Sequence, residues 1–284
     1  MRFRKDASLD TSQVTDRRGM GAGRATLGGG GLIGLIFLVV QLLNNGTGSA
    51  PQFDFGAQTG PDSDLSAECR TGEDANQRDD CRIVAVINSV QAYWEKKLPE
   101  YRPAPTVFFE GQVDTACGLA NSAVGPFYCP PGEKIYIDLG FYADLRTKFG
   151  AKGGPFAEAY VIAHEYGHHV ENLTGALQEG QSDRSTGPQS AGVRVELQAD
   201  CLAGMWANGA VETAFIEELT EADIADGLNA ASSIGDDRIQ QQVQGQVNPE
   251  GFTHGSSEQR QQWFLTGYEK GSLEACDTFA ASKV

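Results

Sequence analysis

The stretch AYVIAHEYGHHVENLTG, residues 159–175, is apolar over most of its length and carries the pattern H-E-x-x-H. Pro155 stands shortly before it and Gly175 ends it, an arrangement typical of a helix with proline in its first turn and glycine just past its last. The sequence therefore predicts one helix from Pro155 to the residue before Gly175. Glycine inside a helix costs about 1 kcal/mol, so we expect Gly167 to let another backbone approach closely.

The pattern itself consists of His164, Glu165 and His168. Residues four apart on a helix are neighbours, so the two imidazoles can hold one zinc ion. Glu165 is rotated from them by about 100°, which places its carboxylate beside the open position of the metal, where a base is needed. The alternative is a polar patch on a surface helix. A third protein ligand elsewhere in the chain would decide between the two.

The segment VELQADCLAG, residues 195–204, supplies that candidate ligand. Glu196 and Asp200 are four apart, so both point to the same side of a helix. Glu196 can complete a His-His-Glu zinc site, and Asp200 can accept the second ring N–H of a zinc-bound histidine. A solvated acidic face is the alternative, but the segment is otherwise largely apolar and buried carboxylates need partners.

The rest of the chain predicts a mainly helical α+β body with a small sheet. Apolar residues recur at helical spacing in residues 81–98, and the segments 105–110 and 134–138 have the composition of strands. A polar loop is expected at 176–190. Further helices are expected at 193–208, from Thr220 onward, and at 256–270.

A polar, basic head precedes an apolar run of about 17 residues, LGGGGLIGLIFLVVQLL. Arginines stand before this run and no Lys or Arg follows it until Arg70, so the positive-inside rule predicts a cytoplasmic N-terminus and an exported body. A cleaved signal peptide and a buried core segment are the alternatives to a retained anchor. The predicted organisation is a disordered cytoplasmic polar tail (1–26), a transmembrane anchor (27–43), a flexible tether (44–79) and a zinc metallopeptidase domain (80–284).

Six cysteines, all after the apolar run, indicate a disulfide framework in an oxidising compartment. Six cysteines allow 15 pairings, which the sequence alone does not resolve. The short loops 69–81 and 117–129 are the plausible local pairs, which leaves Cys201 with Cys276. A cysteine-ligated zinc site is disfavoured because the chain has no C-x-x-C pair.

The formal net charge of −16 disfavours nucleic acid as a partner, because nothing would neutralise phosphates over a broad surface.

Two further motifs carry a resemblance to a known family. They are CGLANSAVGPFYCP at 117–130 and HGSSEQR at 254–260. Together with the basic head, the apolar run and the H-E-x-x-H…E-x-x-x-D pattern, they resemble the bacterial neutral zinc metallopeptidases, the YpfJ-like group, over essentially the whole chain. The resemblance implies a zincin-like domain of the gluzincin type and a zinc-dependent peptidase. The residues that it implies are His164, His168 and Glu196 as zinc ligands, Glu165 as general base, and Asp200 behind a ligand.

Three weaker expectations follow from the same resemblance. His254 is placed to stabilise the oxyanion of a tetrahedral intermediate, with a histidine of a loop or helix entry as the alternative. His169 points elsewhere on its helix and is expected to be structural. The Asn121–Val124 stretch can be the edge strand onto which a peptide is laid, with a disulfide-closed turn as the alternative.

We therefore expect a membrane-anchored zinc metallopeptidase that hydrolyses peptide bonds by zinc-activated water with Glu165 as general base. Its partners would be a peptide or protein substrate and the membrane, and its catalytic domain would be periplasmic or extracellular. The alternatives are a catalytically silent zinc-binding module that recruits partners, and a hydrolase of another amide such as peptidoglycan cross-links.

Overall fold

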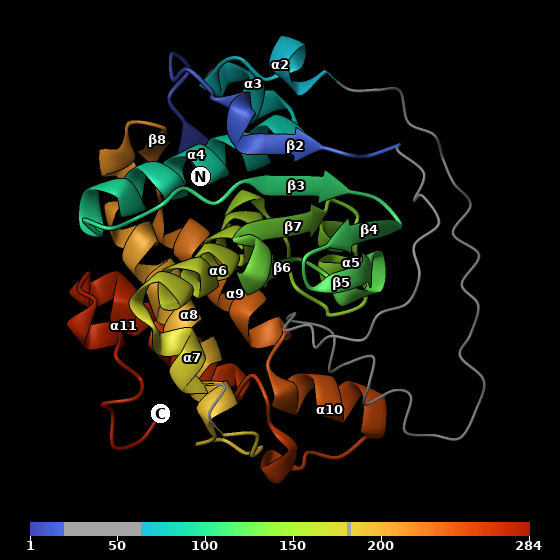
Figure 1. Ribbon diagram of the computed structural model, residues 1–284, viewed down its shortest axis with the longest axis vertical. Helices are drawn as coiled ribbons and strands as arrows, with labels where there is room; N and C mark the ends of the chain where they lie inside the picture. The colour runs from blue at the N-terminus through green and yellow to red at the C-terminus, as the bar shows by residue number, and fades with distance from the viewer. Residues whose placement is uncertain (20–63, 181–182) are drawn as a thin grey trace.

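The computed structural model describes residues 1–19, 64–180 and 183–284 (Figure 1). The predicted anchor at 27–43 lies outside the described residues. Within those ranges, no helix is both long enough and apolar enough to cross a membrane.

Five helices form the body of the molecule: α4 (Asp79–Lys97), α6 (Pro155–Thr174), α8 (Ala191–Gly209), α9 (Glu221–Ser233) and α11 (Ser257–Lys270). α8 packs along both α6 and α11, and α6 also contacts α4 and α9. Large aromatic rings fill the space between them: Phe156 of α6 stacks on Trp206 of α8 at 6.0 Å between ring centroids. The helices expected at 81–98, 155–174, 193–208, after Thr220 and at 256–270 are confirmed.

Glycines let α8 and α11 come close enough for direct backbone contact. A Cβ on Gly204 would lie 2.0 Å from the carbonyl oxygen of Phe264, and one on Gly267 would lie 1.8 Å from that of Cys201. Because no side chain larger than hydrogen fits at either place, these two glycines determine how α11 lies along α8.

A four-stranded sheet in the order β2-β3-β7-β6 lies beside the helices (Figure 1). β2 (Val14–Asp16), β3 (Thr106–Phe109) and β7 (Lys134–Asp138) are parallel, and β6 (Phe127–Cys129) is antiparallel to β7 with Tyr128 opposite Ile135. The strands expected at 105–110 and 134–138 are confirmed. A hairpin of β4 (Gln112–Thr115) and β5 (Gly118–Asn121) packs on the sheet through a separate apolar cluster.

The remaining elements are short. They are β1 (Arg2–Phe3), β8 (Ile216–Glu218), α2 (Leu65–Glu68), α3 (Gly72–Gln77), α5 (Phe141–Thr147), α7 (Ala176–Gly180) and α10 (Asp236–Gln244), with single 3₁₀ turns between them.

The interpretation of residues 1–26 as a disordered tail is wrong for residues 1–19. β1 pairs with β8, and β2 adds a parallel strand beside β3. Phe3 is 1% exposed, and the backbone N–H of Asp10 donates to Asn88 of α4 at 2.8 Å. The segment has a polar composition because its few apolar residues occur singly or in pairs, separated by charged residues that stay at the surface. We name residues 1–19 the N-terminal arm.

The expected tether is also wrong for its last part, residues 64–79. These residues form α2 and α3, with Leu65 and Ala75 buried and Cys69 bonded to Cys81 at the start of α4. A disulfide and two apolar anchors are enough to order a segment with few large side chains.

Two local expectations need correction. α7 occupies the first part of the expected polar loop at 176–190. The Asn121–Val124 stretch is not an edge strand of the main sheet: β5 ends at Asn121, and Ser122–Val124 is a 3₁₀ turn in which the Ala123 N–H donates to the Asn121 side chain. The edge strands of this sheet are β2 and β6 instead.

The expected disulfide framework is confirmed. Cys69 pairs with Cys81, Cys117 with Cys129, and Cys201 with Cys276, and none of the six cysteines is free. The second bridge fastens the hairpin to β6, and the third ties the C-terminal segment to α8.

Candidate metal centre

Helices α6 and α8 bring His164, His168 and Glu196 together in the interior. Nε2 of His164 lies 3.3 Å from one Glu196 carboxylate oxygen, and Nε2 of His168 lies 3.7 Å from the other. One ligand atom from each side chain lies within 4.8 Å of the others, and all three residues are buried. The first two come from successive turns of one helix, and the third comes from the facing helix.

The other ring nitrogen of each histidine is held by a carboxylate. Nδ1 of His164 lies 2.9 Å from Asp200, one turn after Glu196 on α8. Nδ1 of His168 lies 2.7 Å from Glu171, one turn further along α6. A ring that donates from Nδ1 presents the lone pair of Nε2, so both rings offer a ligand atom toward Glu196.

Asp200 is itself surrounded by donors. Arg260 of α11 donates from Nε at 2.8 Å and from Nη2 at 3.0 Å, and the hydroxyl of Tyr160 donates to the same oxygen that faces His164. Both Asp200 and Arg260 are completely buried. The arginine therefore supplies the positive charge that a buried carboxylate needs.

Glu165 lies beside this group, 1% exposed. Its Oε1 is buried without a hydrogen-bond partner among the described residues. Burial is the main reason that the pKa of Glu165 is raised, to about 8, although the nearby His164 and the backbone N–H of Tyr128 on β6 lower it. The base candidate thus lies between the helix and the free edge of the sheet.

Burial and neighbouring charges shift the pKa values of the two histidines in opposite directions. Burial lowers the pKa of His164, but Asp200 and Glu196 outweigh it and raise the pKa to about 9. Burial lowers the pKa of His168 to about 4, and Glu196 only partly opposes it. Burial would raise the pKa of Glu196, but the adjacent histidines hold it well below its ordinary value.

His254 lies near the group without belonging to it. Its Nδ1 is 2.9 Å from the hydroxyl of Thr253 and 3.3 Å from Asp236, and its backbone N–H also donates to Asp236. Burial lowers the pKa of His254, but the Glu196 and Asp236 carboxylates raise it by more, so the pKa is raised overall.

His169 points away from the centre. Its Nε2 donates to the carbonyl oxygen of Arg102 at 2.6 Å, and its Nδ1 lies 3.0 Å from the Tyr128 hydroxyl. Asn172 also donates to the Tyr128 hydroxyl at 3.0 Å. His169 therefore joins α6 to the edge strand, as expected for a structural residue.

The chemistry of this donor set fits zinc. Nε2 of His164, Oε2 of Glu196 and Oε1 of Glu165 are buried and make no hydrogen bond within the described ranges, and the first two face each other at 3.3 Å. Four carboxylates are buried here with Arg260 as the permanently charged cation: Glu165, Glu171, Glu196 and Asp200. Buried acceptors that lack donors are costly unless a cation compensates them, and two imidazoles with one carboxylate are a zinc ligand set.

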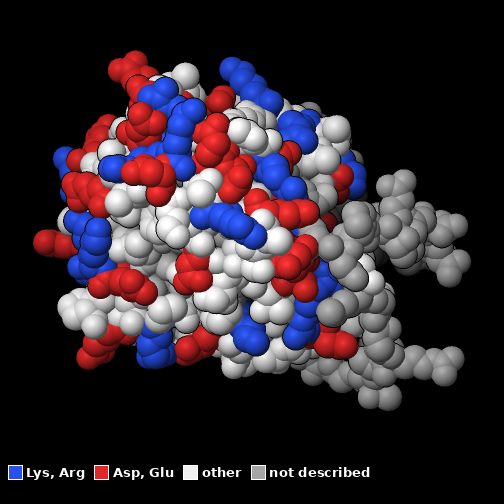
Figure 2. All heavy atoms as spheres, turned by 90° about the horizontal axis from the view of Figure 1, so that it is seen from above, with Lys and Arg blue, Asp and Glu red and all other residues white. Residues whose placement is uncertain are grey.

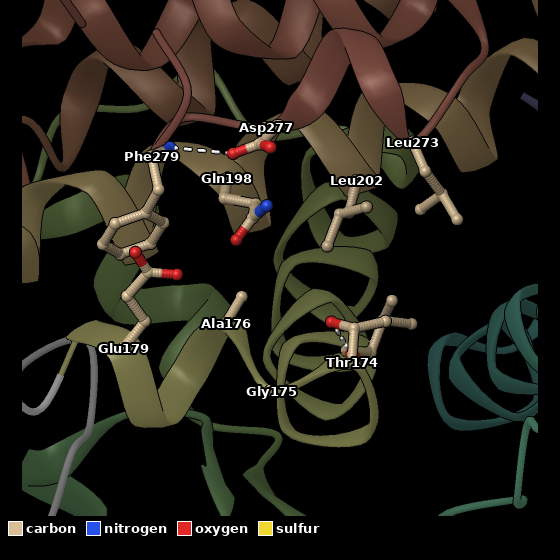
Figure 3. Close-up of a pocket in the computed structure, with 10 residues that line it drawn as sticks. Thr174, Gly175, Ala176, Glu179, Gln198, Leu202, Leu273, Asp277 and Phe279 are labelled. Atoms are coloured by element: carbon tan, nitrogen blue, oxygen red, sulfur yellow. Dashed lines mark hydrogen bonds between the residues drawn. The ribbon is translucent and has the colours of Figure 1, made fainter.

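A separate pocket of about 360 Å³ lies on the other side of α8 (Figure 3). Gln198 of α8 points into it between Asp277 and Glu179, and Leu202, Leu273 and Phe279 form its apolar walls. No zinc-ligand candidate lines this pocket. It is therefore not the substrate site of a centre built on His164.

The surface seen from above carries acidic and basic side chains intermixed (Figure 2). No broad basic patch is visible on this face, which agrees with an acidic chain of net charge −16.

The sequence did not single out Glu171, Arg260 and Tyr160. Glu171 had a local signal, since a carboxylate three residues after His168 on a helix faces it. Arg260 stands in the HGSSEQR motif, but its contact with Asp200 spans 60 positions and depends on how α11 lies along α8.

Comparisons with known proteins identify the family of this chain. A profile of the family described as "Putative neutral zinc metallopeptidase" matches residues 1–279. Uncharacterized protein YpfJ of Escherichia coli (strain K12) is 38% identical over 289 residues, 96% of this chain and 97% of the relative. Uncharacterized protein Rv2575 of Mycobacterium tuberculosis is 52% identical over 229 residues, 78% of each chain. No solved structure matches the chain.

Proposed function

Because the chain belongs to the neutral zinc metallopeptidase family, we propose that it is a zinc-dependent peptidase of the gluzincin type. His164, His168 and Glu196 would bind the metal, and Glu165 would be the general base. The observation that supports the proposal best is the convergence of three buried ligand atoms whose supporting hydrogen bonds are already made. Asp200 and Glu171 occupy the Nδ1 atoms, so each Nε2 is directed to the same point.

When bound, zinc would polarise the scissile carbonyl and acidify a water molecule. Glu165 follows His164 directly and is rotated out of the ligand set, so its carboxylate is available to move a proton. Oε1, buried and without a partner in the described parts of the chain, is the atom that would take the proton and pass it to the leaving amine.

The edge strand β6 supports a peptide as substrate. The backbone N–H of Tyr128 on this strand lowers the pKa of Glu165. An edge strand presents unpaired backbone groups, and an extended peptide can pair with them as an additional strand. A peptide laid along β6 would pass beside the base, which favours a backbone amide over other amides as the bond that is cut.

His254 is the proposed stabiliser of the oxyanion. Asp236 and Thr253 engage its Nδ1. Its Nε2 is then the ring nitrogen that would donate a hydrogen bond to the developing negative oxygen.

Location outside the cytoplasm is also part of the proposal. Three disulfides that involve every cysteine are typical of an oxidising compartment. Attachment to the cytoplasmic membrane would be through residues 27–43, with residues 1–19 and the body on the same side of it. The net charge of −16 argues against nucleic acid as a partner.

The decisive test removes the base and keeps the metal ligands. Glu165→Gln should leave zinc content near one per chain and lower peptide hydrolysis by about 10²–10⁴-fold, the usual contribution of acid–base catalysis. Glu158→Gln is the matched control, because Glu158 is another buried carboxylate of α6 but pairs with Arg82 instead of facing the centre.

Both variants and the wild type would be incubated with a mixed peptide library, with zinc measured on the same samples. A wild type that binds zinc and cleaves no peptide would favour the partner-recruiting module. Cleavage of peptidoglycan cross-links but not of peptides would favour the other amide hydrolase. Equal hydrolysis by the wild type and Glu165→Gln would refute the assigned base.

A further inference from the structure

Arg260 is a charged side chain in the middle of the protein, with no exposed surface at all. A buried charge is costly, and an arginine is kept in such a place only when its donors are matched by acceptors. Its Nε and Nη2 bond the two oxygens of Asp200, Nη2 also donates to the Tyr160 hydroxyl at 3.1 Å, and Nη1 reaches the carbonyl of Ile234 at 3.4 Å.

The arginine acts on one particular oxygen. Oδ1 of Asp200 receives Arg260 Nη2, the Tyr160 hydroxyl and Nδ1 of His164. The fork of the guanidinium sets the plane of the carboxylate, because two parallel N–H···O bonds fix orientation as well as distance. A carboxylate fixed in this plane keeps Oδ1 at the His164 ring.

We propose that Arg260 is a positioning residue for the zinc centre, which acts through Asp200 to hold His164 with Nε2 directed at the metal. The inference rests on the proposed zinc site. Arg260 does not touch the ligand position: its nearest approach to His164 is 3.4 Å at Nδ1, on the far side of the ring from Nε2.

The second ligand has no equivalent support. His168 is held by Glu171 of its own helix, and the outer oxygen of Glu171, Oε1, is buried with no partner in the residues that the structure describes. His164 is thus fixed by a chain of contacts that reaches α11, whereas His168 is fixed within α6. Any change at Arg260 should therefore act through one ligand only.

The test measures zinc affinity by competition with a chelator, on the full chain. Arg260→Lys keeps the charge but loses the fork, and should weaken zinc binding about ten-fold, the lower end of the effect of residues that support metal ligands. Asp200→Asn should weaken it at least as much. The double variant Asp200→Asn/Arg260→Lys should match Asp200→Asn alone, because the guanidinium fork orients the His164 ring through Asp200.

Arg82→Lys is the control, since Arg82 is a mostly buried arginine that pairs with Glu158 away from the centre. Arg82→Lys should leave zinc affinity unchanged, as should the substitution of any arginine that has a merely structural role. Unchanged affinity in Arg260→Lys, or additive losses in the double variant, would overturn the inference.

If Arg260→Lys does not fold, Asp200→Asn would be compared with Asp200→Asn/Arg260→Met, which leaves no unpaired buried charge at this pair. Equal zinc affinity supports the inference, and a further loss overturns it. If the wild type binds no zinc, the proposed function itself is refuted. If the wild type binds zinc and Arg260→Lys binds it equally tightly, only the role of Arg260 is refuted.

Discussion

Gly167 of α6 lies directly against Ala199 of α8: a Cβ on residue 167 would be 2.9 Å from the carbonyl oxygen of Ala199 and 3.0 Å from its Cα. The expected close approach of another backbone is confirmed. It occurs on the turn that carries His168, opposite the turn between Glu196 and Asp200. The absence of one side chain therefore sets the distance between the two helices that hold the centre.

Gly167→Ala should consequently destabilise the protein. Alanine gains up to about 1 kcal/mol of helix propensity, but the clash is with backbone that cannot rotate away, and overpacking costs about 1–3 kcal/mol. We expect a lower urea midpoint and weaker zinc binding, because the helices must separate. Gly192→Ala in α8 is the control: its Cβ would meet only the Thr253 carbonyl oxygen at 3.7 Å. A Gly167→Ala variant as stable as Gly192→Ala would contradict this account of the packing.

Glu171 should matter to zinc affinity although it is not a ligand. Glu171→Ala removes the acceptor at Nδ1 of His168 and should weaken zinc binding about 10–100-fold. Glu171→Gln keeps an acceptor oxygen there and should lose less. Both would be measured by chelator competition, with Glu158→Gln as a control on the same helix. Equal losses in the alanine and glutamine variants would mean that the charge, not the hydrogen bond, supports the ring.

The disulfides should contribute unequally to stability. Cys201–Cys276 joins positions 75 apart, whereas Cys69–Cys81 joins positions 12 apart. In the chain-entropy account, a disulfide that closes a longer loop stabilises the folded protein more. Loss of a native bridge usually costs about 2–5 kcal/mol. Replacing both cysteines of each pair by alanine and comparing urea midpoints should rank Cys201–Cys276 first. The reverse order would indicate that native contacts, not loop closure, dominate.

The native protein should also show no free thiol before reduction. Alkylation in denaturant followed by mass measurement would detect one. Two or more alkylated cysteines in protein folded in an oxidising compartment would refute the complete pairing.

The helices that carry the centre could be predicted from the sequence because their signals are local. A period of 3.6 residues, Pro155 in the first turn and Gly175 at the end define α6 without reference to the rest of the chain. The spacing of four between Glu196 and Asp200 likewise needs only a helix. The fold class followed from the order of these elements.

What the sequence missed depends on contacts between distant segments. β1 and β2 contain two and three residues, too short for any periodicity, and each exists only because a distant strand pairs with it. The edge strand of the main sheet was misplaced for the same reason. Asn121 and Tyr128 are both in strand-like sequence, and only the pairing with β7 shows which strand borders the sheet.

The packing of the N-terminal arm leads to a prediction about compartments. Strand pairing with β3 and β8 and the burial of Phe3 require residues 1–19 and the body to lie on the same side of any membrane. One crossing between residues 19 and 64 would separate them, and those contacts could not form. The arm and the body should therefore both be accessible to reagents from the same side of the membrane. This differs from the cytoplasmic N-terminus that the positive-inside rule favours.

Lys5→Cys on the arm and Lys148→Cys on α5 would report the two positions, because both side chains are exposed, at 74% and 64%, and each makes one surface ion pair. A membrane-impermeant maleimide applied outside the cytoplasmic membrane should label both cysteines or neither, and both should react after detergent lysis. Labelling of Cys at 148 alone would place the arm across the membrane. In that case the N-terminal arm would not pack on the body in the membrane-anchored protein, and β2 would not pair with β3.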